Sequence, residues 1–157
     1  MNLVDNYLSF IVGGERFAIS LKEVREVVPL RDLAPVPFTP DYIQGILNLR
    51  GSIVTVIDLG KRFELKQTQE NEEESILIVE HNQTLLGLKI DSMDGVIHLS
   101  AEELAAPPDF GETAVSRFMT ALVRRERQFI VVLGTEKLFL FDEFSSPAAR
   151  SESKAAV

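Results

Sequence analysis

The chain has 157 residues, of which 45% are apolar, so it can bury the core of one ordinary domain. It carries 24 acidic and 16 basic side chains, a formal charge of −8, which argues against nucleic acid or an anionic membrane as its main partner. There is no cysteine, which excludes disulfides, thiolate metal sites and a cysteine nucleophile, and favours a reducing cytoplasm.

The N-terminal part predicts a hairpin, a helix and a loop. The chain opens without a basic, apolar leader, and no stretch reaches the roughly 18 apolar residues of a membrane-spanning helix, so we expect a cytoplasmic protein. Residues 7–19 are two β-prone runs around a Gly-Gly pair, which predicts a hairpin. Ser20 and Glu23 have capping-box spacing, and apolar residues recur at helical intervals up to Pro29, so a two-turn helix is expected. Three prolines then predict a connecting loop over residues 30–40.

The rest of the chain is predicted to contain further strands joined by short helices and polar loops. Strand pairs are expected at 45–59, 75–90 and 118–133, a single strand at 93–99, short helices at 59–63 and 101–104, and a helix or strand at 135–141.

The two halves repeat the same order of predicted elements. Residues 7–19 and 75–90 are both strand, polar turn and strand, while residues 48–63 and 121–139 are both hairpins that end in Lys-x-Phe. This repetition predicts a mainly β protein built from two small barrel-like units of similar topology.

Candidate catalytic groups do not form a constellation. His81 and His98 lack the neighbours of a zinc site, and the acidic run at 70–74 lacks the glycine turn of a calcium loop. Asp58 and Asp91 follow apolar strands, and we interpret them as caps of the next turn, because no nucleophile or base accompanies them. Nothing in the sequence supports catalysis or a metal site.

Two polar residues interrupt the apolar stretch GILNLRGSIVTVIDL at 45–59. Alternation along a strand places Leu47 and Leu49 on one face and Asn48 and Arg50 on the other, before a glycine turn. Two interpretations remain open. Either Asn48 shapes the turn and Arg50 bonds a nearby acid or carbonyl, or the fixed guanidinium recognises a partner.

Several motifs together resemble the CheW family of bacterial chemotaxis coupling proteins. These are VREV (24–27), PVPFTP (35–40), YIQGILNLRG (42–51), IVTVIDL (53–59) and DSMDGVI (91–97), and the resemblance extends from Tyr7 to about Phe141. It implies two five-stranded, Src-homology-3-like β-barrels packed together with a few short helices. We therefore expect one domain over residues 5–144, with a boundary between its subdomains near 64–75, strand exchange allowed, and a disordered tail at 145–157.

The resemblance implies a role without catalysis or a cofactor. Family members bridge the cytoplasmic tips of chemoreceptors to the regulatory domain of the histidine kinase CheA, in arrays at the membrane. The corresponding receptor-binding region here contains Glu26, Arg50, Asn48, Val24 and Gly45. Kinase contacts are not assigned, and the sequence does not show whether Glu26 and Arg50 form an ion pair.

Some features depart from the family, and other functions stay open. Thr55 stands where many members have proline, and the basic turn at 124–127 is individual to this chain. The same scaffold role in a pilus-motility or other non-flagellar pathway is the first alternative. A small-ligand-binding β-barrel is the second, and a hydrolase, which lacks its catalytic groups, is the weakest.

Overall fold

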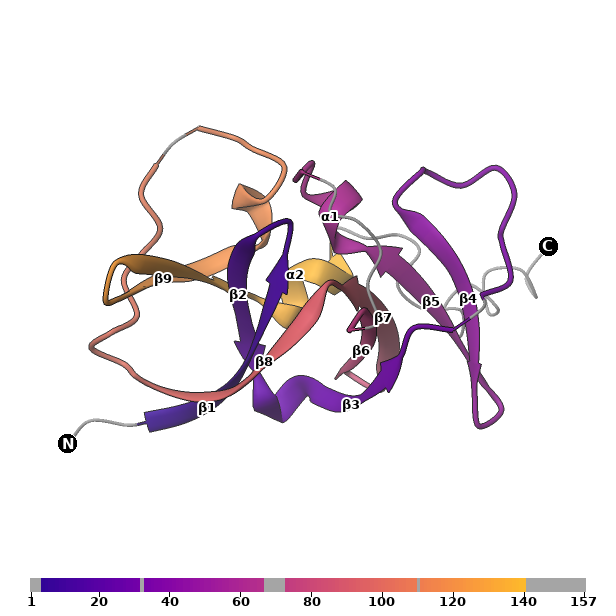
Figure 1. Cartoon of the computed structure of the whole chain (residues 1–157), viewed down its shortest axis with the longest axis horizontal. Coiled ribbons are helices and arrows are strands. Elements are labelled where there is room, and N and C mark those ends of the chain that lie inside the picture. The colour runs from indigo at the N-terminus through magenta and orange to yellow at the C-terminus, as the bar shows by residue number, and fades with distance from the viewer. Residues whose placement is uncertain (1–3, 32, 67–72, 110, 141–157) are drawn as a thin grey trace.

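The computed structural model describes residues 4–31, 33–66, 73–109 and 111–140, which form two five-stranded sheets (Figure 1). The strands of the first sheet are β1 (Val4–Val12), β2 (Glu15–Ser20), β8 (Ser92–Ser100), β9 (Met119–Arg125) and β10 (Gln128–Leu133). Those of the second sheet are β3 (Val24–Pro29), β4 (Ile43–Leu49), β5 (Ser52–Asp58), β6 (Ser75–His81) and β7 (Thr84–Ile90). The helical elements are α1 (Leu59–Arg62), α2 (Thr135–Leu140) and 3-10 turns at Leu21–Glu23 and Ser116–Phe118.

Each sheet takes strands from both halves of the chain. The order is β8-β1-β2-β10-β9 in the first sheet and β3-β6-β7-β5-β4 in the second. Strands β6–β10 of the second half correspond in turn to strands β1–β5 of the first half. With this correspondence, both sheets have the same strand order: third, first, second, fifth, fourth. The repeated order of elements in the sequence therefore corresponds to a repeated topology, in which each half gives two strands to one sheet and three to the other. The predicted tail at 145–157 and part of the predicted boundary at 64–75 lie outside the described residues.

Each sheet curls into an open barrel. Among the described strands, β3 does not pair with β4 along its length, nor β8 with β9. Instead Ala34, which follows β3, exchanges two backbone hydrogen bonds with Ile46 in β4, with N···O distances of 3.1 and 2.8 Å. Ala105, which follows β8, makes the equivalent bridge to Leu122 in β9, at 3.0 and 2.8 Å. These two bridges give each subdomain its Src-homology-3-like form.

Three apolar cores hold the molecule together. The largest lies between the sheets and contains a row of four phenylalanine rings with successive centroid distances of 5.9, 5.5 and 5.4 Å: Phe10, Phe17, Phe63 and Phe118. A second core fills the second sheet with Val28, Leu47, Leu49, Val54, Val56, Ile76 and Ile78. A third fills the first sheet with Ala18, Leu99, Ala121, Val123, Ile130 and Val132. Side chains thus fill both small barrels, as their size requires.

The helix predicted up to Pro29 is wrong. Only residues Leu21–Glu23 form a 3-10 turn, in which the Ser20 Oγ accepts a hydrogen bond from the Lys22 N–H at 3.3 Å. The chain then continues as strand β3, because its valines pair with β6 and β-branched side chains favour a sheet over a helix. Pro29 is tolerated because β3 is an edge strand. No helix in the described residues is long and apolar enough to cross a membrane.

Ser100 and Glu103 have capping-box spacing and are in contact, but the expected helix at 101–104 is a turn. The Glu103 carboxylate accepts from the Ser100 N–H at 3.1 Å and from the Arg125 Nε at 3.0 Å. The hydrogen bond from Arg125, with a further one from the Ser100 backbone, lowers the pKa of Glu103. Glu103 therefore ties the end of β8 to the end of β9.

Glu103→Gln should make the protein slightly less sensitive to acid. The native pKa of Glu103 is below its unfolded value of about 4.3, so the stabilisation is present above that pH and is lost as the pH falls through the native pKa. Because the pair is one-third exposed, we expect the effect on the free energy of unfolding to stay below about 1 kcal/mol. Urea unfolding of the wild type and the variant at about pH 6.5 and about pH 3 measures how much unfolding free energy each loses on acidification. A variant that loses as much stability on acidification as the wild type would contradict the prediction.

Candidate functional site

A tight hairpin turn presents the polar residues that interrupt the apolar stretch. Arg50 and Gly51 connect β4 to β5 with φ angles of 49° and 89°, as in the two-residue turns that match strand twist. The Asn48 Oδ1 accepts a hydrogen bond from the Gly51 N–H at 3.0 Å, so Asn48 shapes the turn. Leu47 and Leu49 are buried and Asn48 and Arg50 are exposed, as strand alternation predicted.

Arg50 and Glu26 form an ion pair, which answers the question that the sequence left open. The Arg50 Nη2 contacts the Glu26 Oε1, and the Arg50 side chain is 72% exposed while that of Glu26 is 25% exposed. Glu26 lies in β3 and Arg50 follows β4, the two opposite edges of the second sheet. The pair therefore spans the seam of this barrel. It also holds a guanidinium in one orientation at the surface.

Val24 and Gly45 are more buried than Asn48 and Arg50. Val24 lies opposite Val79 and is half-buried against the core between the sheets. Gly45 is buried, with φ +149°, and a Cβ there would lie 2.8 Å from both the Leu33 Cβ and the Ala34 oxygen. Gly45 therefore shapes the backbone beside the closing bridge and offers no side chain to a partner.

Three neighbours of the ion pair were missed from the sequence. A bulge between Val24 and Glu26 leaves Arg25 outside the regular ladder, and Arg25 pairs with Glu80 at 2.8 Å. Val27 and Ile53 are exposed apolar side chains, the first next to Glu26 and the second opposite Asn48. For Val27 and Ile53, the sequence signal is a run of valines and isoleucines on both faces of a strand. Val27 and Ile53 are therefore exposed apolar groups on the same barrel as the ion pair.

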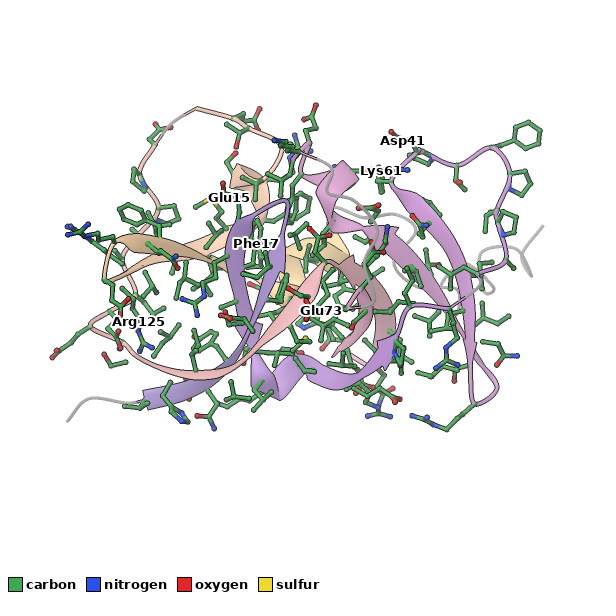
Figure 2. The ribbon with its side chains drawn as sticks, in the orientation of Figure 1. Glu15, Phe17, Asp41, Lys61, Glu73 and Arg125 are labelled. Atoms are coloured by element: carbon green, nitrogen blue, oxygen red, sulfur yellow. The ribbon has the colours of Figure 1, made fainter. Side chains whose placement is uncertain are left out.

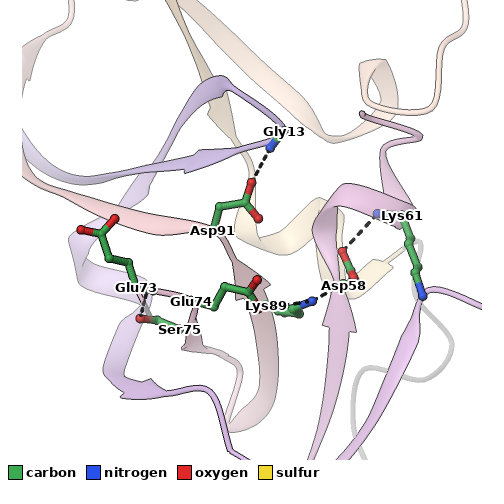
Figure 3. Close-up of polar contacts among 8 residues, drawn as sticks. All are labelled: Gly13, Asp58, Lys61, Glu73, Glu74, Ser75, Lys89 and Asp91. Carbon is green, nitrogen blue, oxygen red and sulfur yellow. Dashed lines mark hydrogen bonds and ion pairs between the residues drawn. The ribbon is translucent and has the colours of Figure 1, made fainter. Parts of the chain in front are cut away.

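A polar junction lies between α1, β6 and β7 (Figure 3). The Lys89 Nζ is 3.5 Å from the Asp58 Oδ2 and 3.6 Å from the Glu74 Oε2, and all three side chains are largely buried. The other Asp58 oxygen accepts from the Lys61 N–H at 3.2 Å, so Asp58 caps α1 as predicted. These groups line a polar cavity of about 250 Å³. The ammonium lies between two carboxylates, so the buried charges are paired, and the arrangement resembles no acid-base pair.

The Asp91 side chain contacts a distant turn, a contact that the sequence did not predict. Its Oδ2 accepts from the Gly13 N–H at 2.8 Å, while the Asp91 N–H donates to the Ile11 oxygen at 3.0 Å. The chain crosses from the second sheet to the first at this residue. Asp91 therefore ties the β1–β2 turn to the crossover, a long-range contact that spacing cannot reveal.

Both histidines contact side chains of neighbouring elements. The His81 Nδ1 lies 3.8 Å from the Glu23 Oε2, and its ring stacks on Phe139 with centroids 5.8 Å apart. The His98 Nδ1 contacts the Asn6 side chain across the β1–β8 ladder. Within the described part of the chain, no three His, Cys, Asp or Glu side chains are grouped as metal ligands.

Comparisons with known proteins give one consistent result. A family model described as "CheW-like domain" matches residues 6–142. The chemotaxis protein CheW of Treponema pallidum is 32% identical over 90% of this chain and 85% of the relative. Protein PilI of Pseudomonas aeruginosa is 24% identical over 79% of this chain and 70% of its own length. The crystal structure of the scaffolding protein TtCheW from Thermoanaerobacter tengcongensis has a TM-score of 0.81 and 27% identity, and the match covers 92% of this chain and 97% of that one.

Proposed function

The chain belongs to the CheW-like domain family. We propose that it is a chemotaxis adaptor that couples chemoreceptors to the histidine kinase CheA. The observation that carries the proposal is the family match over residues 6–142, which takes in both sheets. The role is non-catalytic and needs no cofactor. An adaptor only has to hold two partners in a geometry that is sensitive to the state of one of them.

We place the receptor on the face that carries the Glu26–Arg50 pair. Glu26 orients the guanidinium of Arg50, and a mostly exposed arginine retains donors for a partner's carboxylate or carbonyl groups. Orientation before binding reduces the entropy lost when the partner docks. Val24, Asn48 and Gly45 support this face through packing, turn geometry and backbone position.

The kinase then occupies a second face, by contact between its regulatory domain and this protein's barrels. Simultaneous binding of both partners would recruit the chain from the cytoplasm to receptor arrays at the membrane. Avidity within such an array makes modest individual affinities sufficient.

Arg50→Ala should weaken binding to a chemoreceptor cytoplasmic fragment about tenfold or more, because an oriented arginine is a frequent energetic centre of an interface. Binding to the CheA regulatory domain should be unchanged. The free energy of unfolding should fall by at most about 1 kcal/mol, since the pair is exposed. Isothermal titration against both partners and urea unfolding measure these quantities.

Arg16→Ala is the matched control, because Arg16 forms an ion pair with Asp94 in the first sheet, away from the Glu26–Arg50 pair. It should leave receptor binding near that of the wild type. If Glu26 acts by orienting Arg50, then Glu26→Ala and Arg50→Ala should be non-additive, with the double variant close to Arg50→Ala. Equal loss of both partners on Arg50→Ala would make the residue structural, and binding of neither partner by the folded wild type would overturn the adaptor proposal.

The similarity to protein PilI favours one second candidate, the same adaptor role in a pathway that does not control flagella. Titration against receptor fragments from each chemosensory gene cluster of the organism separates the two candidates.

A further inference from the structure

The connection between β3 and β4 carries a fully exposed aromatic ring. Phe38 has a relative exposure of 105%, the highest among the large apolar side chains of the described residues. It also has φ +62°, the left-handed region that a bulky residue rarely adopts. A phenylalanine in this position gains nothing from burial and strains its own backbone. Residues held in this way against local preference tend to serve function.

The backbone around Phe38 is ordered by its own contacts. The Thr39 Oγ1 donates to the Val36 oxygen at 2.8 Å, and the Ile43 N–H donates to the Pro40 oxygen at 3.1 Å. The bridge from Ala34 to β4 anchors the other end of the connection. Three prolines at 35, 37 and 40 restrict the remaining backbone angles. The ring is therefore presented before any partner arrives, which reduces the entropy lost on binding.

The segment that carries Phe38 is free of charge. Residues 33–40 (LAPVPFTP) contain no ionisable side chain, in a protein in which 25% of residues are charged. Absence of charge with an aromatic at the centre is typical of the core of a protein interface. The chemistry that fits such a tip is an apolar cleft in a folded partner. A charged surface does not fit.

The tip lies away from the Glu26–Arg50 pair. The connection enters β4 at its first residue, near Asp41, which Figure 2 labels, whereas the Arg50 turn follows its last residue (Figures 1 and 2). Seven residues of strand separate the two points by roughly 20 Å. A receptor that contacts Arg50 therefore leaves Phe38 available to the other partner.

We infer that Phe38 is an aromatic anchor that inserts into an apolar cleft on the kinase regulatory domain. The inference rests on the proposed function and assigns to this chain a kinase contact, which the sequence motifs did not supply. The prolines and hydrogen bonds of the connection restrain the backbone that carries the ring, so the partner binds a ring whose point of attachment is already fixed.

Phe38→Gly tests the inference, because glycine adopts φ +62° without strain and removes the whole side chain, ring included. We expect affinity for the CheA regulatory domain to fall about tenfold or more, affinity for the receptor fragment to stay within twofold, and the unfolding midpoint to stay equal or rise. Phe38→Asn, which also tolerates this conformation, should behave in the same way. Phe129→Thr is the matched control, because Phe129 is 56% exposed in a strand of the other sheet, and it should leave kinase binding near wild type.

Each other outcome overturns the inference. Wild-type kinase affinity in both Phe38 variants would show that the ring is not an anchor, while the adaptor role would stand. If the Phe38 variants lose receptor binding and keep kinase binding, Phe38 contacts the receptor and the inference is wrong. A lower unfolding midpoint of Phe38→Asn would show that the ring supports the fold, because asparagine does not add the unfolded-state entropy that glycine adds. A wild-type protein that binds neither partner would overturn both the inference and the proposed function.

Discussion

Phe63→Ala should lower the free energy of unfolding by about 3–5 kcal/mol, the usual cost of removing a buried ring and leaving a cavity. Phe63 follows α1 and is 3% exposed, and its ring lies 5.5 Å from that of Phe17 and 5.4 Å from that of Phe118. It is thus the link in the aromatic row between the sheets. Because a domain of this size is stable by only about 5–15 kcal/mol, the variant should unfold at a much lower urea concentration.

The control is Phe129→Ala, which removes the same ring from an exposed site and should change the free energy of unfolding by less than about 0.5–1 kcal/mol. Circular dichroism during urea unfolding measures both variants. A small effect of Phe63→Ala would mean that the sheets do not depend on their shared core. Two separate transitions would mean that the sheets unfold independently.

Gly45→Ala should lower the free energy of unfolding by about 2–4 kcal/mol, through backbone strain and overpacking together. The methyl group would lie 2.8 Å from the Leu33 Cβ and from the Ala34 oxygen, and backbone cannot move away as a flexible side chain can. The bridge between Ala34 and Ile46 should weaken with it. Loss of that bridge opens the barrel seam that the Glu26–Arg50 pair spans.

Gly51→Ala is the matched control, because Gly51 also has a positive φ, +89°, but a Cβ there meets nothing within 4 Å. Its cost should be confined to strain, about 1–2 kcal/mol. Urea unfolding of the two variants isolates the steric part at Gly45. Equal losses of unfolding free energy in the two variants would contradict a steric clash between the methyl group of Gly45→Ala and residues 33 and 34. Receptor binding that falls only in proportion to the folded fraction would confirm that Gly45 acts through the fold.

Strand positions were largely predictable because alternation and turn residues are local signals. The hairpins around Gly13-Gly14, Arg50-Gly51 and Asn82-Gln83 all form, as the β-prone runs on either side of them predicted. The failure at residues 20–29 has a physical cause. Apolar residues there have helical spacing, but the pairing of β3 with β6 overrides it, and that partner is distant in the sequence.

The candidate site was predictable in its members but not in its geometry. Alternation placed Asn48 and Arg50 on the outside of the hairpin, and the resemblance added Glu26, Val24 and Gly45. Neither could show that Glu26 pairs with Arg50, because the two residues approach only when the edges of the second sheet meet. The resemblance to the CheW family is confirmed by the family match, whereas the binding roles of the individual residues stay predictions.

The β class, the repeated order of elements, the turns and the family could be inferred before folding was considered, because periodicity, glycine and proline positions and motifs are properties of short segments. Only the folded chain shows which half supplies each strand, that Asp91 accepts a hydrogen bond from Gly13 and that Glu26 pairs with Arg50. It also shows that Phe38 stands in solvent with a left-handed backbone. These features depend on contacts between residues far apart in the chain, and a local pattern carries no information about which distant segment it will meet.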